Sequence, residues 1–269
     1  MAELRAQVRE HLDSGAFEVP TLPAVATQVL AMVEDEDSNA AQLAALICKD
    51  QALATHLLRL ANSPAFCGVT RIVSLQQAIT RLGMRAIAEL VVTICMQGSV
   101  FSGRAYRALI EELWAHALAT ALFAKEVARQ QRHNIEAAYL CGLLHRVGMP
   151  IVLKAVTDLC PAKALPEEEQ VRVVLAELHV SAGLQAVELW GLPSQVAVAV
   201  KDSERYEQAQ DHRNLAAMVH LSSALASTML RGGEAELSEL PVLEELSIYP
   251  DNLSELRQHE ERIFAAVAA

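Results

Sequence analysis

Residues 139–153 read Tyr-Leu-Cys-Gly-Leu-Leu-His-Arg-Val-Gly-Met-Pro-Ile-Val-Leu. The run is apolar up to His145, which predicts a buried helix that carries this imidazole in its last turn. Gly148 and Pro150 predict the end of that helix. A histidine at a buried helix end suits a metal ligand or a general base, so the residues beside it decide which chemistry is available.

The composition favours helices along the whole chain. Of 269 residues, 52% are hydrophobic but only 4% are aromatic, and such a core packs as helices more readily than as sheets. We therefore predict an all-α protein with two helical subdomains, residues 1–103 and 104–269, joined by a hinge at Gly98–Gly103. The expected helices cover residues 3–13, 24–33, 40–48, 51–61, 75–82, 84–96, 106–132, 135–145, a short stretch to 159, 167–178, 181–190, 193–201, 214–230, 238–246 and 253–267.

Several of these helices begin at recognisable capping residues. Ser74 with Gln77 three positions later predicts a capping box, and Gly83 predicts the end of that helix. Asn62-Ser63-Pro64 predicts a corner, because Asn and Ser side chains bond nearby backbone groups and Pro prevents the helix from continuing. Further N-caps are expected at Asn39 or Ser38, at Asp50 and at Asn134.

Charge and hydropathy exclude two classes of partner. The net charge of -11 repels a phosphate backbone, so we expect no nucleic acid partner. The N-terminus lacks the apolar core of a signal peptide, and the most apolar stretch noted, Ala86–Phe101, is short for a bilayer crossing and contains Glu89 and Gln97. We expect a cytoplasmic protein with no membrane partner.

The five cysteines are isolated from one another. None forms a CxxC pair, so we expect small buried hydrophobic residues in a reducing compartment, and neither a disulfide framework nor a zinc site. They are Cys48, Cys67, Cys95, Cys141 and Cys160.

Two groups of motifs together resemble the HDOD domain, an HD-related output domain of bacterial signalling proteins. The first group comprises residues 58–63 (Leu-Arg-Leu-Ala-Asn-Ser), 72–79 (Ile-Val-Ser-Leu-Gln-Gln-Ala-Ile) and 82–83 (Leu-Gly). The second comprises residues 113–116 (Leu-Trp-Ala-His), 142–148 (Gly-Leu-Leu-His-Arg-Val-Gly) and 190–193 (Trp-Gly-Leu-Pro), and is similar to the HD-like half of that family. The resemblance covers roughly residues 17–230, and its motifs occur in the family's order.

The resemblance implies a metal site that has been altered. In the catalytic HD phosphohydrolases, a more distant likeness, a first His, an adjacent His-Asp pair and a late Asp hold a divalent metal that acidifies a water for attack on phosphorus. His116 matches the first His and His145 the second, but Arg146 replaces the paired Asp and Ser223 the late Asp. Two lost carboxylates and an added guanidinium disfavour a cation. We therefore expect no metal, no cofactor and no catalytic residue.

Each vestigial position also has a purely structural interpretation. His116 and His145 are expected as core histidines bonded to backbone or side-chain groups. Arg146 is expected at a helix end, paired with an acid, although with His179 it could instead form an anion pocket. Ser223 lies outside any GxSxG elbow, so a serine hydrolase is not supported.

These observations predict a non-catalytic regulatory protein. We expect it to bind a protein partner in a signalling pathway, supplied in trans because the chain has no room for a sensor or receiver domain, and a small ligand could occupy the cleft between the subdomains. Two alternatives stay open: a degenerate metal-dependent phosphohydrolase acting on a nucleotide or cyclic dinucleotide, and a sensor that binds a nucleotide without hydrolysing it.

Overall fold

The computed structural model describes residues 2–14, 17–63, 66, 71–160, 164–232 and 237–268. These residues form helices and connecting segments without a strand, as predicted. The helices are α1 (Ala2–Asp13), α2 (Ala24–Glu34), α3 (Ala40–Ile47), α4 (Gln51–Ala61), α5 (Leu75–Ser99), α6 (Arg107–Gln130), α7 (Ile135–Leu144), α8 (Gly148–Leu159), α9 (Glu168–Leu189), α10 (Ser194–Asp202), α11 (Arg213–Arg231), α12 (Val242–Glu245), α13 (Pro250–Arg257) and α14 (Glu260–Val267), with 3-10 turns η1 (Tyr206–Gln208) and η2 (Leu237–Glu239).

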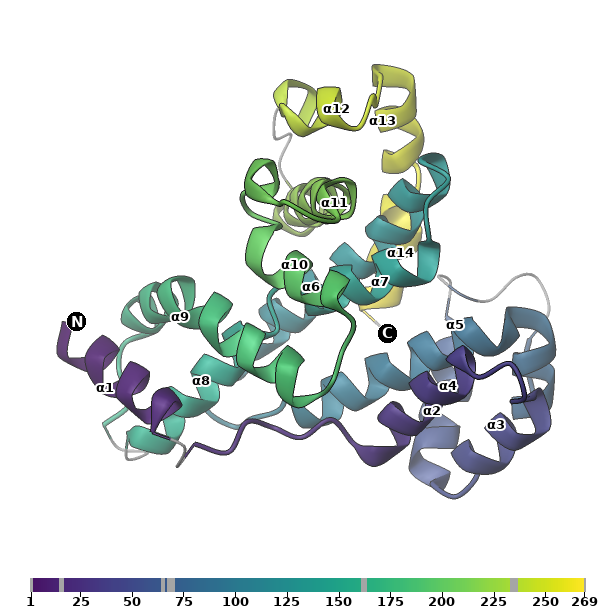
Figure 1. The fold of residues 1–269 in the computed structure, drawn as a ribbon, viewed down its shortest axis with the longest axis horizontal. Coiled ribbons are helices and arrows are strands. Elements are labelled where there is room, and N and C mark those ends of the chain that lie inside the picture. The colour runs from purple at the N-terminus through teal and green to yellow at the C-terminus, as the bar shows by residue number, and fades with distance from the viewer. Residues whose placement is uncertain are drawn as a thin grey trace.

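The helices are arranged as three lobes around a central pair. Figure 1 shows α2–α5 at the lower right, α1 with α8 and α9 at the lower left, α11–α13 at the top, and α6 and α7 between them. The middle of α6 is buried among α7, α11 and α14. Helix α1 contacts α8 and α9, although it precedes the first lobe in the chain. The division at residue 103 stays a prediction.

The first lobe is built from the capping residues that the sequence indicates. The Asn39 side chain accepts hydrogen bonds from two backbone amides at the start of α3 while Gln42 returns one, a complete capping box. Ser74 accepts from the Gln77 backbone amide, but the Gln77 side chain accepts from the backbone of Val73, one residue before the cap, so the predicted box is shifted at this end. The hydrogen bond to Ser74 still fixes the start of α5.

Two features of the first lobe set its turns. Gly83 adopts φ 84° and ψ 160°, which only glycine reaches easily, and it divides α5 where the sequence predicts a helix end. The Asn62 side chain bonds the Leu58 carbonyl at 2.7 Å and both backbone groups of Ile72 at 2.8 Å, so it ties the end of α4 to the approach to α5. Pro64, the last residue of the predicted corner, lies outside the described residues.

The predicted end of the central helix was wrong in detail. Helix α7 ends at Leu144, and Gly148 and Pro150 lie in the first turn of α8. Proline is tolerated there because the first turn needs no intrahelical N–H bond. Gly148 serves packing, since an added Cβ would lie 1.7 Å from the carbonyl oxygen of His179. Helices α8 and α9 can therefore approach closely only with glycine at this position.

Other boundaries differ from the prediction for similar reasons. The predicted helices 167–178 and 181–190 form one helix, α9, because no Gly or Pro interrupts residues 176–182. The predicted tail helices are broken into shorter ones: Ser247 has φ 50°, Pro250 starts α13, and a turn precedes α14. The expected hinge is partly helical, because α5 continues to Ser99.

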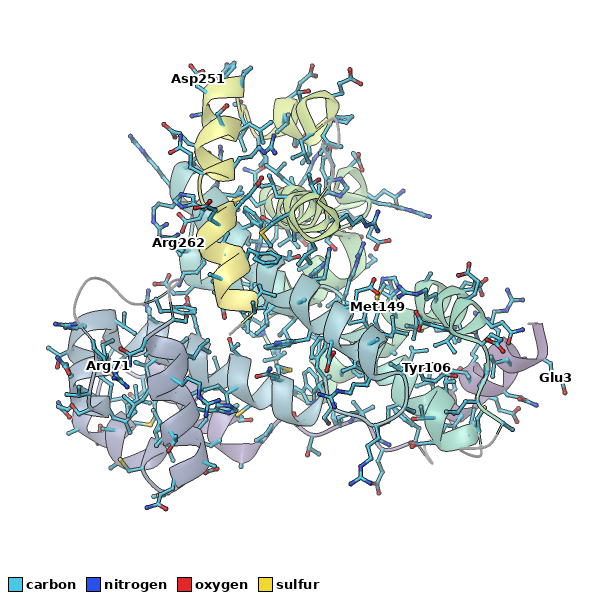
Figure 2. The ribbon with its side chains drawn as sticks, turned by 180° about the vertical axis from the view of Figure 1, so that it is seen from behind. Glu3, Arg71, Tyr106, Met149, Asp251 and Arg262 are labelled. Atoms are coloured by element: carbon cyan, nitrogen blue, oxygen red, sulfur yellow. The ribbon has the colours of Figure 1, made fainter. Side chains whose placement is uncertain are left out.

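The C-terminal helix is held against α6 by charge. Glu126 on α6 pairs with Arg129 and with Arg262 of α14, the latter at 2.7 Å. Figure 2, seen from behind, shows Arg262 on α14 and Asp251 at the far end of α13. The carboxylate is largely buried while both arginines are about half exposed, so the cluster fixes the position of α14.

The most apolar helical segment differs from the one predicted from the sequence. Among the described residues one segment, Ile135–Leu159, has the length and mean hydropathy of a membrane-crossing helix, and it is not the stretch 86–101 noted in the sequence. The most apolar part of this segment is 72% buried inside the molecule, and a turn divides the segment into α7 and α8, as expected of core helices.

The cysteines differ in burial. Cys95 and Cys141 are buried as expected, but Cys48 is exposed at the end of α3. Cys160 is half-buried, and Cys67 lies outside the described residues.

Candidate functional site

The four positions of the altered HD motif come together at the centre of the molecule. His116 projects from α6, His145 and Arg146 follow the end of α7, and Ser223 projects from α11. The His116 and His145 rings lie 5.5 Å apart between centroids, and the Ser223 hydroxyl oxygen lies 3.5 Å from His116 Nε2. The packing of α6 on both α7 and α11 creates this convergence.

His145 is enclosed and oriented by the backbone. Its Nδ1 lies 2.7 Å from the Gly142 carbonyl oxygen, and because a carbonyl only accepts, Nδ1 carries the proton. Nε2 then presents a lone pair, and it has no hydrogen-bond partner among the described residues. The residue is 1% exposed. His145 therefore offers one free acceptor nitrogen toward the motif.

His116 is engaged by hydroxyl groups on α11. Its Nε2 lies 3.1 Å from the Ser227 hydroxyl oxygen, closer than to the Ser223 hydroxyl. Ser227 lies one helical turn after Ser223 and was not singled out from the sequence, although an i+4 spacing places both on one face of α11. His116 Nε2 is thus already engaged by a hydroxyl of α11.

Arg146 is paired with an acid that the sequence did not identify. Its guanidinium donates to Glu204 Oε1 at 3.0 Å, and the same oxygen lies 3.9 Å from His179 Nε2. The Arg146 side chain is 30% exposed and that of Glu204 is 52% exposed. Glu204 follows α10, far from the motif in sequence. The acid that pairs with Arg146 is therefore Glu204. The anion pocket of Arg146 and His179 stays a prediction.

Burial and the guanidinium keep these imidazoles neutral. Burial, then the charge of Arg146, lowers the pKa of His116 from 6.5 to about 4. The same two causes hold the pKa of His145 well below its ordinary value. Burial also lowers the pKa of His179, with Glu204 opposing and Arg146 reinforcing the change. Each ring is therefore uncharged near neutral pH.

Two hollows flank the motif and share Arg146 and Ser227. One, of about 350 Å³, is bounded by His145, Glu204, His220 and Ser223, among others. The other, of about 230 Å³, is bounded by Glu112, His116 and Arg231, among others. Arg146 stands between them and reduces the attraction of either hollow for a cation.

The residues present do not fit the divalent metal of an HD site. Among the described residues, no three His, Cys, Asp or Glu side chains are grouped so that they could hold a metal ion. Arg146 and Ser223 occupy the two positions where carboxylates would offset the charge of the ion. What remains is a site with uncharged imidazoles, serine hydroxyls and the guanidinium of Arg146.

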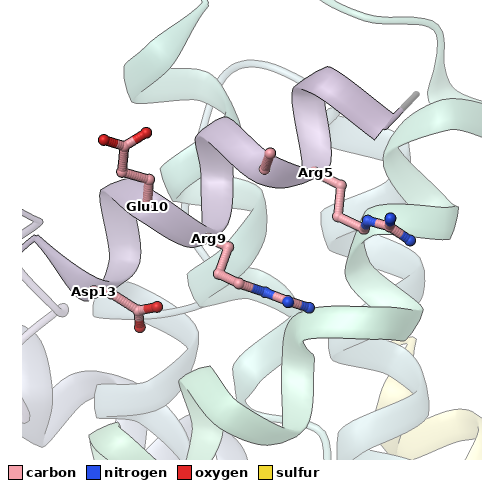
Figure 3. Close-up of a pocket in the computed structure, with 5 residues that line it drawn as sticks. Arg5, Arg9, Glu10 and Asp13 are labelled. Atoms are coloured by element: carbon pink, nitrogen blue, oxygen red, sulfur yellow. The ribbon is translucent and has the colours of Figure 1, made fainter.

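Other concavities lie away from the motif, including one on α1 and one between two lobes. The hollow on α1 carries Arg5, Arg9, Glu10 and Asp13, whose side chains point in different directions (Figure 3). Arg5 is already paired with Glu177 at 2.9 Å, so this surface has the character of a solvated helix face. The larger cavity, about 640 Å³, lies between the α2–α5 lobe and the α7 and α9–α10 region.

One family model matches most of the chain. A family model described as HDOD domain matches residues 19–206. An uncharacterized protein of Treponema pallidum (strain Nichols) is 26% identical over 254 residues, which are 89% of this chain and 47% of that protein. The chain therefore spans about half the length of this curated relative.

Solved structures share the fold. A protein from Shewanella amazonensis SB2B, provisionally named a metal-dependent phosphohydrolase, matches with a TM-score of 0.78 at 20% identity, over 99% of this chain and 98% of that one. An HDOD domain protein with unknown function from Geobacter sulfurreducens matches with a TM-score of 0.76 at 22% identity, over 99% and 97%. At these identities the likeness shows the fold alone.

Proposed function

The chain belongs to the HDOD domain family, and on this premise we propose that it is a non-catalytic, cytoplasmic regulatory protein that acts in signal transduction by binding a protein partner. The family match covers more than half of the chain. It agrees with the resemblance found in the motifs, which implies an output domain of bacterial signalling proteins.

The observation that carries this proposal is Arg146 in the place of the paired acid. A guanidinium is charged at any ordinary pH. Burial is the larger cause of the lowered pKa of His116 and His145, and the charge of Arg146 lowers both further. A metal at this point would meet a cation where it needs an anion, and Ser223 adds no charge. A metal-activated water is therefore disfavoured, and binding is the remaining use of the fold.

The proposed output is a change in the relative position of the two helical subdomains. They meet where α5 contacts α7 and where α1 packs on α8 and α9, and a cavity of about 640 Å³ lies beside the contact of α5 with α7. Phe101, in the connection after α5, packs edge-on against Trp114 of α6 at 5.3 Å between ring centroids. A small rotation about residues 98–103 would open or close the cavity and alter the surface that both halves present.

Calorimetric titration with Mn²⁺ tests the non-catalytic part. The wild type should show no binding at millimolar Mn²⁺, whereas Arg146→Asp combined with Ser223→Asp should bind one equivalent, because it restores both carboxylates. Arg231→Asp is the control for charge: it makes the same charge change as Arg146→Asp, beside the smaller hollow, without adding a ligand at an HD position. Tight binding of one equivalent by the wild type would overturn the proposal.

A further inference from the structure

The cavity between the subdomains is a mixed apolar and polar cleft. It has a volume of about 640 Å³, within the range of small-molecule sites. Three segments distant in sequence form most of it: α5, the first half of α7 and the turn between α9 and α10, with α2 closing one side. Arg85, Ala88, Glu89 and Val92 recur at helical spacing, so one face of α5 forms a continuous wall.

Glu89 is the unusual residue in this wall. It is 7% exposed, and its Oε2 accepts a hydrogen bond from Lys125 Nζ at 2.6 Å. Its other oxygen, Oε1, is enclosed and has no hydrogen-bond partner among the described residues. Buried carboxylate oxygens are normally bonded, since a lone buried acceptor forfeits its hydration without return. A donor that is not part of this chain therefore suits Oε1.

The neighbouring protein donors are already committed. Lys125 is held over the Tyr139 and Phe66 rings, at 5.2 and 5.6 Å from their centroids. The Tyr139 hydroxyl oxygen lies 2.6 Å from the Thr93 hydroxyl, which in turn donates to the Glu89 backbone carbonyl. These contacts engage the carboxylate through Oε2, whereas Oε1 stays without a partner among the described residues, in a side chain that lines the cleft.

We propose that this cleft binds a small organic cation, an amine or amidine on an apolar body, whose N–H group donates to Glu89 Oε1. Among the charged residues that line the cleft, Glu89 and Glu136 outnumber Arg85, so the lining carries a net negative charge when Glu89 is ionised. Apolar side chains supply the rest of the surface, and an apolar body would be buried against them. These side chains include Leu22, Leu30, Val33, Val92, Leu140, Trp190 and Leu192.

Occupation would connect both subdomains. The wall of α5 belongs to the first subdomain, and Leu140 and Trp190 belong to the second. The Trp190 indole N–H also donates to the Pro20 carbonyl at 3.0 Å, so the α9–α10 turn is tied to the segment that leads into α2. This inference rests on the proposed function only for its consequence, a ligand-dependent subdomain position; the binding itself stands independently.

Calorimetric titration with three compounds that share an apolar group and differ in the charge of their polar head tests the site. 2-Phenylethylamine, 3-phenylpropionamide and 3-phenylpropionate share an aromatic end but carry a cationic, a neutral and an anionic head. The amine should bind with a dissociation constant of roughly millimolar order, as fragments of this size do. The amide should bind at least about tenfold more weakly, and the carboxylate should not bind.

Two variants assign the binding to Glu89. Glu89→Gln should weaken amine binding by about tenfold or more, because the anionic acceptor is lost. Glu89→Gln with Lys125→Met should do the same while leaving no unpaired buried charge, which separates a lost contact from a damaged fold. The control Glu204→Gln removes a carboxylate at the HD motif, away from the cleft, and should leave amine binding unchanged.

The pH dependence provides a second readout. Burial raises the pKa of Glu89 from 4.5 to about 7, partly opposed by Lys125. If the amine pairs with the ionised form, its affinity should rise by up to about tenfold between pH 6 and 8 in the wild type and stay flat in Glu89→Gln. The charged and titratable groups that face Glu89 are Lys125 and Arg129 of α6 and Glu136 and Tyr139 of α7, with Arg85 on its own helix in the same cleft.

Each contrary result overturns the proposal. Equal affinity for amine and carboxylate, or unchanged amine affinity in both Glu89 variants, would show that Glu89 Oε1 does not bind the amine. A buried water would then be its hydrogen-bond partner. Equal affinity for amine and amide would refute the choice of a cation. No heat with any compound would refute the site while leaving the proposed regulatory function standing, because that function is tested by Mn²⁺ at Arg146 and Ser223.

Discussion

The buried carboxylate of Glu89 makes a pH-dependent contribution to folding that can be worked out in advance. Burial raises its pKa from 4.5 to about 7 in the folded protein. Folding therefore favours the protonated form: the stability is fully present below pH 4.5 and is lost as pH rises through 7. At about 1.4 kcal/mol per pH unit, the displacement amounts to about 3 kcal/mol.

Glu89→Gln should expose this contribution, because an amide imitates the protonated acid and cannot ionise. Its free energy of unfolding relative to wild type should rise by about 3 kcal/mol between pH 4.5 and 8. Urea denaturation followed by circular dichroism at a series of pH values measures the difference. The amide oxygen can still accept a hydrogen bond from Lys125, which is largely buried, as the protonated acid does in the wild type, so the two proteins should be about equally stable near pH 4.5.

The paired substitution Glu89→Gln with Lys125→Met removes the ammonium as well. It should have the same pH slope as the single variant, displaced at all pH values by a constant amount, because a largely buried ammonium has been replaced by an apolar side chain. A difference from wild type that is flat with pH, or that falls as pH rises, would refute the assignment of a desolvated carboxylate to Glu89.

Three further expectations follow from named contacts. Gly148→Ala should destabilise the protein by more than about 3 kcal/mol in urea denaturation, because the new Cβ would overlap a carbonyl oxygen of α9; Gly98→Ala, with open space around its Cβ, should be neutral or stabilising by up to about 1 kcal/mol. Arg146→Gln should raise the pKa of His116, measured by NMR titration of the imidazole, since a neighbouring positive charge is removed; an unchanged or lowered pKa would contradict that cause. Asn39→Ala should lower the free energy of unfolding by about 1 kcal/mol through loss of the α3 capping box, and no change would show that solvent replaces the cap.

The fold could be predicted because its signals are local. Helix starts at Asn39, Asp50 and Asn134 follow from side chains that accept the first backbone amides, and those bonds are present. The helix boundaries that were predicted wrongly are those that depend on tertiary packing. Gly148 reads as a helix stop, yet its purpose is the close approach of α8 to α9, which depends on residues some thirty positions later.

The site could be predicted in part for a related reason. His116, His145, Arg146 and Ser223 have fixed places in a motif, so their convergence could be anticipated from family resemblance. Glu204 could not be, because its role depends on how the segment after α10 folds over Arg146.

One feature of the sequence points to an unusual role for Glu89. A single carboxylate within the apolar run Ala86–Met96 is unusual, because buried acids are rare without a partner. Lys125 lies thirty-six residues away on another helix, so the pairing itself could not be foreseen. In the sequence alone, this carboxylate indicates only an interruption of a possible membrane span.

The most direct test of the central claim combines metal analysis with a turnover assay on the purified wild type. The protein is supplied with Mn²⁺, washed, analysed for bound metal, and incubated with nucleotide and cyclic dinucleotide phosphodiester substrates. A site with Arg146 and Ser223 in place of carboxylates predicts substoichiometric metal and no turnover above the rate of a His145→Ala control. One bound metal per chain together with turnover that disappears in His145→Ala would contradict the account.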